Sequence, residues 1–387
     1  MRSISLSVAL AASAVVVAAP SRVAQSPVRA DSAPAVRQAA MAGDVPIVRA
    51  LYVNRSAAQS MRRMRSLIAI ADSTEINALV IDMKDEFGLN FVSSDPMVAR
   101  NAGRGGTVPH LAALLDTLKA HGIRPIARLV VFKDSVAARL NPDHVIRQPN
   151  GQPWRDKKGL TWVDPYDTTI WEYDTRVAEE VARMGFAEVQ FDYIRFPEPY
   201  KSLPPQVFSD ARGLSKPQAL ARFFAKACPR VRKLGAACTA DIFGLVTTVP
   251  GALEVGQSWE PLSPATDVLL PMVYPSLYPH GAFGFPKPNA EPYRVVYAAI
   301  ARAHQRDVKL GITSPSHVRP WLQAFTLGTA RYGAHEVEEQ KRAVYDAGYD
   351  SWELWNPGSQ YGVYVPGLEK VLASRRKGSG VDVGTVR

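Results

Sequence analysis

Short apolar runs alternate with amphipathic stretches along most of this sequence. Eight runs read as strands, at residues 48–53, 78–83, 124–131, 188–194, 236–242, 268–273, 308–313 and 349–355. Between them, helical periodicity covers residues 57–72, 108–121, 168–184, 215–233, 290–304 and 331–346, whereas residues 244–266 are less clearly helical. Strands and helices in strict alternation indicate parallel βαβ units.

Eight such units over about 320 residues predict an α/β fold, the (β/α)8 TIM barrel, with long loops on its C-terminal face. The main rival is a doubly wound open sheet, which usually has fewer strands and a glycine-rich phosphate turn. Neither G-x-G-x-x-G nor a Walker sequence follows an early strand here. Residues 133–167, 196–214 and 274–290 all follow strand ends, so we expect them to form a cleft on the C-terminal face.

The N-terminus has the pattern of an export signal. Arg2 precedes an apolar stretch, Val8 to Ala19, which is short for a membrane span. An uncleaved membrane anchor is the alternative, and both readings place the barrel outside the cytoplasm, in the periplasm or the extracellular space. The expected organisation is a signal peptide at 1–24, a linker at 25–44, the (β/α)8 barrel at 45–372 and a disordered basic tail at 373–387.

The net charge of the protein limits the kinds of molecule that we expect it to bind. The chain of 387 residues has a formal net charge of +10, partly in the tail at 375–377. A basic balance is compatible with nucleic acid, with an anionic polymer substrate or with a solvated basic surface. Basic runs interleaved with aromatic residues are missing from the sequence, as are nucleic-acid-binding motifs, so nucleic acid is not an expected partner. The sequence does not fix the oligomeric state.

Cys228 and Cys238 are the two cysteines. An exported chain can pair them, but one lies on a predicted helix and the other on the next predicted strand, and the sequence leaves the pairing open. Two cysteines ten residues apart without a histidine cluster do not make a zinc site. We expect no cofactor.

The most informative run is Val189 to Pro197, with the sequence VQFDYIRFP. Alternation places Gln190 and Asp192 on one face of this strand, opposite Val189 and Phe191. Asp192 then lies at the C-terminal end of the fourth barrel strand, where barrel enzymes place their catalytic groups.

Acids, cations and aromatic residues end the other strands as well. Alternation puts Asp82 and Lys84 on one side of the second strand and Glu353 with Trp355 on the eighth. Glycoside hydrolysis needs this set, because two carboxylates must flank the scissile bond while other side chains hold the sugar. The candidates that we expect to contact substrate are Tyr52, Asp82, Lys84, Arg128, Trp162, Arg195, Tyr274, Trp355 and Asn356. A serine nucleophile is poorly supported, since there is no G-x-S-x-G elbow.

Each candidate also has a structural interpretation, and a divalent metal is a further alternative. Asp82, Asp85 and Glu86 are acids of the kind that hold such a metal. The structural interpretations are an ion pair of Asp82 with Lys84, pairing of Asp192 with Arg195 or Arg128, a turn cap for Asp241, a loop contact for Glu353, and loop core for Trp154 and Trp162.

Several of these segments together resemble the glycosyl hydrolase domain family DUF4015. The resemblance spans about residues 45–370 and is most specific in the string FDYIRFP at 191–197. Its other parts are VIDMKD at 80–85, RLVVF at 128–132, WVDP at 162–165 and PMVYP at 271–275. It implies a TIM barrel related to alpha-amylase-like and other barrel glycosidases, and it implies hydrolysis of carbohydrate.

The resemblance also suggests roles. Barrel glycosidases place an acid at the end of strand four, which Asp192 occupies, and alpha-amylase-like enzymes place a Glu proton donor on strand five, where this chain has Asp241. Met272, Tyr274 and Trp355 are similar to residues of chitinase-like barrels. The Asp-x-Asp-x-Glu of those enzymes is not matched, because the last acid is missing after Asp192, and substrate-assisted chemistry is therefore not supported.

The leading hypothesis is an exported glycoside hydrolase that acts on a polysaccharide or cell-envelope glycan. Asp192 is its expected nucleophile or base, Asp241 the first choice of general acid and Glu353 the second. Tyr52, Tyr274, Trp162 and Trp355 would line the sugar sites. The alternatives are a catalytically inactive glycan-binding or envelope scaffold barrel and a metal-dependent hydrolase or deacetylase.

Overall fold

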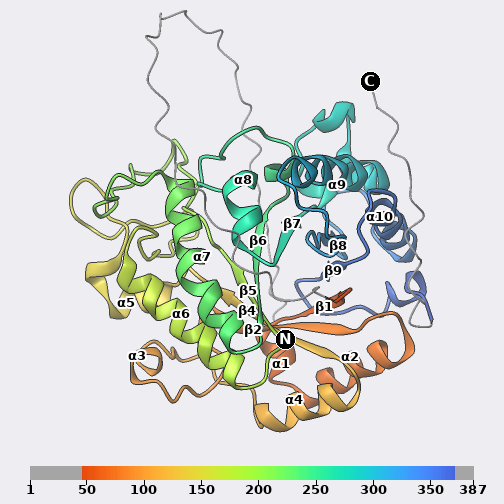
Figure 1. The fold of residues 1–387 in the computed structure, drawn as a ribbon, viewed down its shortest axis with the longest axis horizontal. Coiled ribbons are helices and arrows are strands. Elements are labelled where there is room, and N and C mark those ends of the chain that lie inside the picture. The colour runs from red at the N-terminus through yellow and green to blue at the C-terminus, as the bar shows by residue number, and fades with distance from the viewer. Residues whose placement is uncertain (1–45, 371–387) are drawn as a thin grey trace, which may run out of the picture.

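Eight parallel strands close into a barrel in the computed structural model, which describes residues 46–370 (Figure 1). Hydrogen bonding runs in the order β1-β9-β8-β7-β6-β5-β4-β2 and returns from β2 to β1. The strands are β1 (Arg49–Val53), β2 (Ala78–Asp85), β4 (Arg124–Val130), β5 (Glu188–Asp192), β6 (Ala237–Phe243), β7 (Val268–Met272), β8 (Trp321–Gln323) and β9 (Trp352–Trp355). A two-residue strand, β3 (Gly88–Leu89), pairs antiparallel with the end of β2. The predicted (β/α)8 barrel is confirmed.

Helices between the strands cover the outside of the barrel, with α6 against α7 on one flank and α9 against α10 on another (Figure 1). The long helices are α2 (Met61–Ser73), α4 (Leu111–Ala120), α6 (Thr168–Arg183), α7 (Lys216–Lys233), α9 (Pro292–Lys309) and α10 (Ala334–Asp346). The short ones are α1 (Arg55–Ala58), α3 (Pro96–Ala99), α5 (Ser135–Leu140) and α8 (Trp259–Leu262). Short 3-10 turns occupy Pro142–His144, Gly244–Thr247, Ser263–Ala265, Pro275–Leu277, Ala282–Gly284, Pro288–Ala290 and Val365–Gly367.

The two faces of each barrel strand lie in different environments. On β5, Val189 and Phe191 point to the helices, and the Phe191 ring packs edge-on against Phe223 and Phe224 of α7. This shell between strands and helices is the main hydrophobic core. The opposite face of β5 carries Gln190 and Asp192 into the barrel interior. Alternation along the strand therefore sends the polar side chains inward.

The seventh barrel strand is not at residues 308–313, and that prediction is wrong. Helix α9 continues through Lys309, and Val308 is exposed. The strand partner of β7 lies further along the chain, where Val318 bridges Leu269 and Trp321 pairs with Met272. Pro320 lies inside this stretch, and because proline cannot donate a ladder hydrogen bond, the segment does not look like a buried strand in the sequence.

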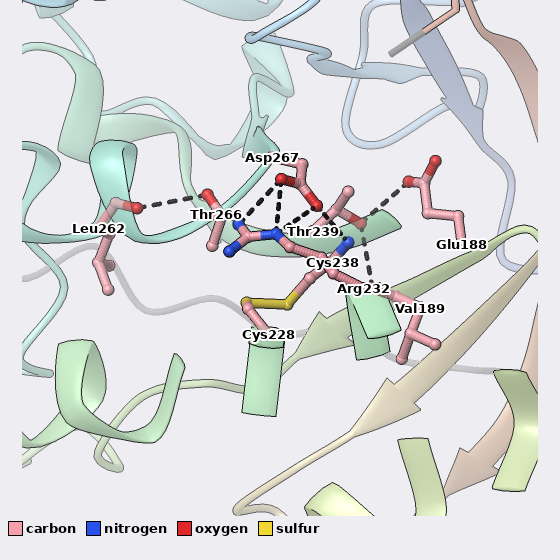
Figure 2. Close-up of a disulfide and its surroundings, with 9 residues drawn as sticks. All are labelled: Glu188, Val189, Cys228, Arg232, Cys238, Thr239, Leu262, Thr266 and Asp267. Atoms are coloured by element: carbon pink, nitrogen blue, oxygen red, sulfur yellow. Dashed lines mark hydrogen bonds and ion pairs between the residues drawn. A yellow bond between two sulfur atoms is a disulfide. The ribbon is translucent and has the colours of Figure 1, made fainter. Parts of the chain in front are cut away.

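A disulfide joins Cys228 of α7 to Cys238 of β6 (Figure 2). The pairing left open by the sequence is thus made. Asp267 accepts hydrogen bonds from the Arg232 Nε at 2.9 Å and from the Cys238 N–H at 2.8 Å. The covalent bond and these contacts fix the start of β6 against α7, three residues before Asp241.

The predicted signal peptide, linker and basic tail lie outside the described residues. Within residues 46–370, no helix is both long enough and apolar enough to cross a bilayer.

Candidate active site

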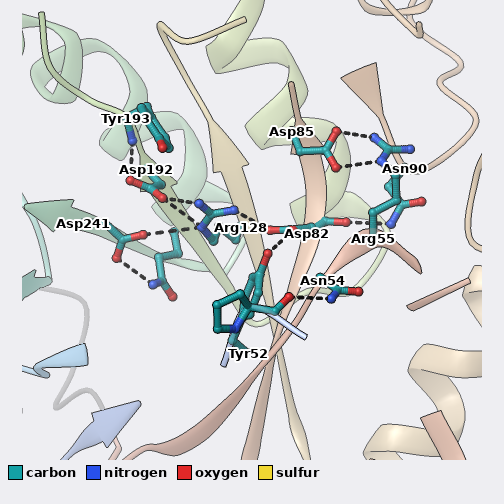
Figure 3. A network of polar contacts seen from close by, with 12 residues as sticks. Tyr52, Asn54, Arg55, Asp82, Asp85, Asn90, Arg128, Asp192, Tyr193 and Asp241 are labelled. Atoms are coloured by element: carbon teal, nitrogen blue, oxygen red, sulfur yellow. Dashed lines mark hydrogen bonds and ion pairs between the residues drawn. The ribbon is translucent and has the colours of Figure 1, made fainter. Parts of the chain in front are cut away.

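Polar side chains from five neighbouring strands meet inside the barrel toward the C-terminal ends of the strands (Figure 3). All five are at least nine-tenths buried, so their mutual contacts are strong in a medium of low dielectric constant. They are Tyr52 of β1, Asp82 of β2, Arg128 of β4, Asp192 of β5 and Asp241 of β6.

Arg128 lies at the centre of this group and contacts three acids. Its Nε donates to Oδ2 of Asp192 at 3.0 Å, and its Nη2 contacts the same oxygen. Its Nη1 donates to Oδ1 of Asp82 at 2.5 Å, and its Nε is 3.9 Å from Oδ2 of Asp241. Because a guanidinium is planar and always charged, it fixes the relative positions of the carboxylates.

Asp192 is held at both oxygens. Its Oδ1 accepts a 2.5 Å hydrogen bond from the backbone N–H of Tyr193. Tyr193 has φ of 51°, a left-handed conformation that is uncommon for a residue other than glycine. Such strained positions persist where the surroundings enforce them, and they cluster at functional sites. The left-handed backbone at Tyr193 therefore fixes the direction of its own N–H and, through the hydrogen bond, the orientation of the Asp192 carboxylate.

Asp241 is surrounded differently. Its Oδ1 accepts hydrogen bonds from Gln190 Nε2 at 2.8 Å and from the indole N–H of Trp321 at 2.7 Å. Its Oδ2 is enclosed and has no hydrogen-bond partner in the described part of the chain. Burial raises the pKa of Asp241 well above its usual value; the charge of Asp192 raises it further and Arg128 opposes the shift. Burial and the neighbouring charge of Asp192 therefore favour the protonated form of this carboxyl.

Asp82 and Tyr52 form the other side of the site. The Tyr52 hydroxyl donates to Oδ2 of Asp82 at 2.5 Å. Burial raises the pKa of Asp82 to about 6, although Arg128 opposes the shift. The Tyr52 ring stacks on Trp355 with centroids 3.9 Å apart, and Arg128 lies 5.3 Å from the Trp355 ring. Trp355 is partly exposed, so its ring is open to a ligand at the barrel mouth.

Tyr274 follows β7 and lies close to the two acids. Burial raises the pKa of its hydroxyl, and Asp241 and Asp192 add to the effect. Among residues 46–370 its hydroxyl has no hydrogen-bond partner.

Glu353 is fully buried and shares the Gln190 amide nitrogen with Asp241. Its Oε1 accepts from Arg319 at 3.0 Å and its Oε2 from Gln190 at 3.1 Å. Arg319 also binds Glu188, the residue at the start of β5, so this network belongs to the barrel floor. Burial raises the pKa of Glu353 to about 7, against the charge of Arg319.

Lys84 does not join the site, and the expectation that it shares a face with Asp82 is wrong. The pairing of β2 with β4 shifts register between Asp82 and Lys84, and a bulge of this kind turns the following side chain to the other face. The Lys84 ammonium is fully buried outside the barrel, 2.8 Å from Asp134 and 2.7 Å from Asp174 of α6. It therefore pairs with neither Asp82 nor a ligand at the mouth.

Three other expected contacts lie in the loops. Arg195 pairs with Glu198 at 3.0 Å, not with Asp192, and its guanidinium lies 5.1 Å from the Trp162 ring. Trp162 is 1% exposed, so it is loop core beneath the mouth and not an open platform. The Asn356 amide is used by the loops themselves. It donates to the carbonyl of Ala324, which follows β8, and its oxygen accepts from two backbone N–H groups in the loop after β9.

The expected metal ligands diverge. Asp85 forms a two-pronged ion pair with Arg55, at 2.7 and 2.8 Å, away from Asp82 (Figure 3). Glu86 is exposed. In the described ranges of the chain, no three acidic, histidine or cysteine side chains converge as a metal site would require.

Sequence reasoning missed Trp321, Gln190 as a ligand of Asp241, and the aromatic turn at Tyr193. Alternation had already put Gln190 on the face of Asp192, and this was the signal for it. Trp321 had no such signal, since its strand was placed elsewhere.

The chain also matches known proteins. The solved glycoside hydrolase domain of PgaB (BpsB) from Bordetella bronchiseptica has a TM-score of 0.60 and 15% identity, covering 84% of this chain and 99% of that one. The spore cortex-lytic enzyme SleL from Bacillus megaterium QM B1551 has a TM-score of 0.50 and 9% identity, covering 85% of this chain and 75% of that one. At these identities the likeness concerns the fold alone.

A hypothetical protein from Ruminiclostridium thermocellum ATCC 27405 is 33% identical, over 49% of this chain and 96% of that one, with a TM-score of 0.45. The curated proteins include no match. The family model described as "Putative glycosyl hydrolase domain", DUF4015, matches residues 50–361. This span includes every strand of the barrel from β2 to β9 and most of β1, and the chain therefore belongs to the DUF4015 family of glycosyl hydrolase domains.

Proposed function

We propose that this protein is an exported glycoside hydrolase that cleaves a polysaccharide or cell-envelope glycan with Asp192 and Asp241 as its acid pair. The observation that carries the proposal is their shared contact with Arg128. The guanidinium Nε is 3.0 Å from Oδ2 of Asp192 and 3.9 Å from Oδ2 of Asp241. These two oxygens are thus at most about 7 Å apart, which is below the upper limit of roughly 9.5 Å for the carboxyl groups of glycosidases.

The surroundings give the two acids different roles. Asp192 receives a charged donor at one oxygen and a backbone donor at the other, and these contacts hold its carboxylate in place. It is the nucleophile or the base. Asp241 has a raised pKa and one oxygen without a partner, so it holds the proton that a leaving glycosidic oxygen needs. Paired-carboxylate hydrolysis requires one carboxyl group that carries a proton and one that is ionised.

Aromatic side chains supply a place for the sugar. Trp355 is stacked on Tyr52 and partly exposed, and Tyr274 adds a hydroxyl without a partner in the described chain. Membership of a glycosyl hydrolase family supports carbohydrate as the substrate. Arg128 lies against Trp355 and Tyr52, so the same cation joins the sugar platform to the acid pair.

The depth of the site favours a second candidate, an inactive glycan-binding or scaffold barrel. Asp192 is 6% exposed and Asp241 is 1% exposed. Two carboxyl groups this deeply buried can hydrolyse a glycan only if the loops above them let the glycan enter the barrel. A glycan-binding barrel needs only the aromatic platform at the mouth.

A reducing-sugar assay against a panel of bacterial and plant polysaccharides separates the two candidates. We expect hydrolysis of at least one glycan, and we expect Asp192→Asn to reduce kcat by at least about a thousandfold. The melting temperature of this variant should stay near that of the wild type. Asp116→Asn is the matched control, because Asp116 is exposed on α4, far from the mouth. A folded Asp192→Asn protein with full activity would refute the assignment, and binding without hydrolysis would favour the scaffold.

A further inference from the structure

One buried cation in the described chain has no anionic partner. Eight lysine and arginine side chains are buried among residues 46–370, and seven have a carboxylate within ion-pair distance. These seven are Arg49, Arg55, Lys84, Arg128, Arg195, Arg319 and Lys341. The exception is Lys133, which is 8% exposed and has neither an ion pair nor a side-chain hydrogen bond within this range.

Lys133 lies beside the proposed nucleophile. It lies three residues after the end of β4, and the preceding N–H, of Phe132, donates to the Tyr193 carbonyl at 3.3 Å. Its ammonium is 4.8 Å from the centre of the Tyr193 ring. Tyr193 directly follows Asp192 and is partly exposed at the mouth. A ligand seated on this ring would therefore meet the ammonium and the acid pair together.

The acids near Lys133 are already engaged. The carboxylate of the next residue, Asp134, turns to Lys84 at 2.8 Å and to the N–H of Ala137 at 2.8 Å. Glu198 pairs with Arg195, the other cation against the Tyr193 ring. These contacts leave the charge of Lys133 uncompensated.

The stem of Lys133 is buried, but its ammonium is not enclosed and reaches water at the mouth, where its charge has no counter-ion among residues 46–370. The face of the Tyr193 ring attracts this charge but accepts no strong hydrogen bond from the three N–H donors. A ligand that brings a negative oxygen to this position would replace the water and supply the missing anionic partner.

We propose that Lys133 binds a carboxylate carried by the sugar that lies over Tyr193, so that the substrate is an acidic glycan of the uronic acid class. The proposal rests on the proposed function, since it assigns the substrate of the same site. The formal net charge of +10 acts in the same direction, because a basic protein attracts an anionic polymer over its whole surface.

Binding measurements test the proposal independently of catalysis. The protein carries Asp192→Asn to prevent turnover, and calorimetry measures Kd for oligogalacturonate and hyaluronan, for sulfated carrageenan oligomers and for neutral cello- and chito-oligosaccharides. We expect a carboxylated glycan to bind, and we expect adding Lys133→Met to weaken it at least about tenfold. Lys119→Met is the matched control, because Lys119 is exposed on α4 and removes the same charge. It should change Kd less than about twofold.

Lys133→Gln repeats the test with a polar side chain, and circular dichroism checks that each variant is folded. The proposal is overturned if both Lys133 variants bind the carboxylated glycan as the parent does, if only neutral or sulfated glycans bind, or if no carboxylated glycan binds. Wild-type activity separates this result from the proposed function. Hydrolysis of neutral glycans alone would contradict the acidic substrate and support the proposed hydrolase. Binding of a carboxylated glycan that depends on Lys133, without hydrolysis, would support the acidic ligand and contradict the proposed hydrolase.

Discussion

The indole N–H of Trp321 donates a 2.7 Å hydrogen bond to Oδ1 of Asp241. The two residues lie on β8 and β6, with β7 between them, so the contact crosses the barrel interior. A donor to a carboxylate stabilises its ionised form, and Trp321 therefore limits the rise in pKa that burial imposes on Asp241.

Trp321→Phe should raise the pKa of Asp241 further, since it removes this donor and keeps an aromatic ring. The basic limb of the pH profile of kcat/KM reports loss of the acid's proton, so it should move to higher pH. Trp352→Phe is the control, because its indole binds the Tyr345 hydroxyl outside the barrel. A basic limb that stays in place or moves to lower pH in Trp321→Phe would contradict the assignment of Asp241 as the acid.

The alternation of strands and helices was enough to predict the barrel, because seven of its strands are compact apolar runs near the predicted positions. The remaining strand failed for a local reason. Residues 308–313 look like a strand, yet α9 extends into them, while the true strand contains Pro320 and only three residues of regular β8. A proline that lies within a barrel strand hides that strand from any argument based on propensity.

The inward positions of Asp192 and Asp82 followed from period-two alternation, and the structure brings them together at Arg128. Lys84 broke the same rule, because a bulge resets the alternation and leaves no mark in the sequence. Trp162 could not be placed by alternation either, since it lies in a long loop whose packing depends on residues far away in the chain.

Lys84→Met should destabilise the protein without changing KM. The substitution leaves Asp134 and Asp174 buried without their cation, and breaking a buried ion pair costs about 3–5 kcal/mol. Urea unfolding of the variant, with Lys119→Met as the control for loss of one charge, measures the difference. Burial raises the pKa of Asp174 to about 7 even beside Lys84, so the cost should be smaller at pH 5, where the proton neutralises this carboxyl. A stable variant with a raised KM would instead place Lys84 in contact with substrate.

Loss of the disulfide should weaken the fold and spare the site. Cys228 and Cys238 are ten residues apart, and closing a loop of this size stabilises a protein by about 2–3 kcal/mol in the chain-entropy description. The paired variant Cys228→Ala, Cys238→Ala should lose about that much unfolding free energy in urea. Activity at 25 °C should remain, because Asp241 is also held by Gln190 and Trp321. Equal stability of the variant and the wild type would show that the bond contributes nothing.

Glu353 differs from Asp241 in its expected role, and one substitution tests this. Glu353→Gln keeps the shape of the side chain and one acceptor oxygen, so it retains the contact with either Gln190 or Arg319. Hydrolysis should persist in this variant and disappear in Asp241→Asn, because Asp241, unlike Glu353, is within 4 Å of the cation that holds Asp192. The opposite result, an active Asp241→Asn and an inactive but folded Glu353→Gln, would make Glu353 the acid.

The same Glu353→Gln variant should alter how stability depends on pH. Burial raises the pKa of Glu353 from an ordinary 4.5 to about 7 in the folded protein. The folded state thus binds more protons than the unfolded state between these values, and the contribution of Glu353 to stability falls as pH rises through this window. Glutamine does not titrate, so the unfolding free energy of the wild type relative to the variant should fall by about 2–3 kcal/mol from pH 5 to pH 8. Urea titrations of both proteins at the two pH values measure this change. A relative stability of the wild type that rises with pH would show that Arg319 outweighs burial and keeps Glu353 ionised.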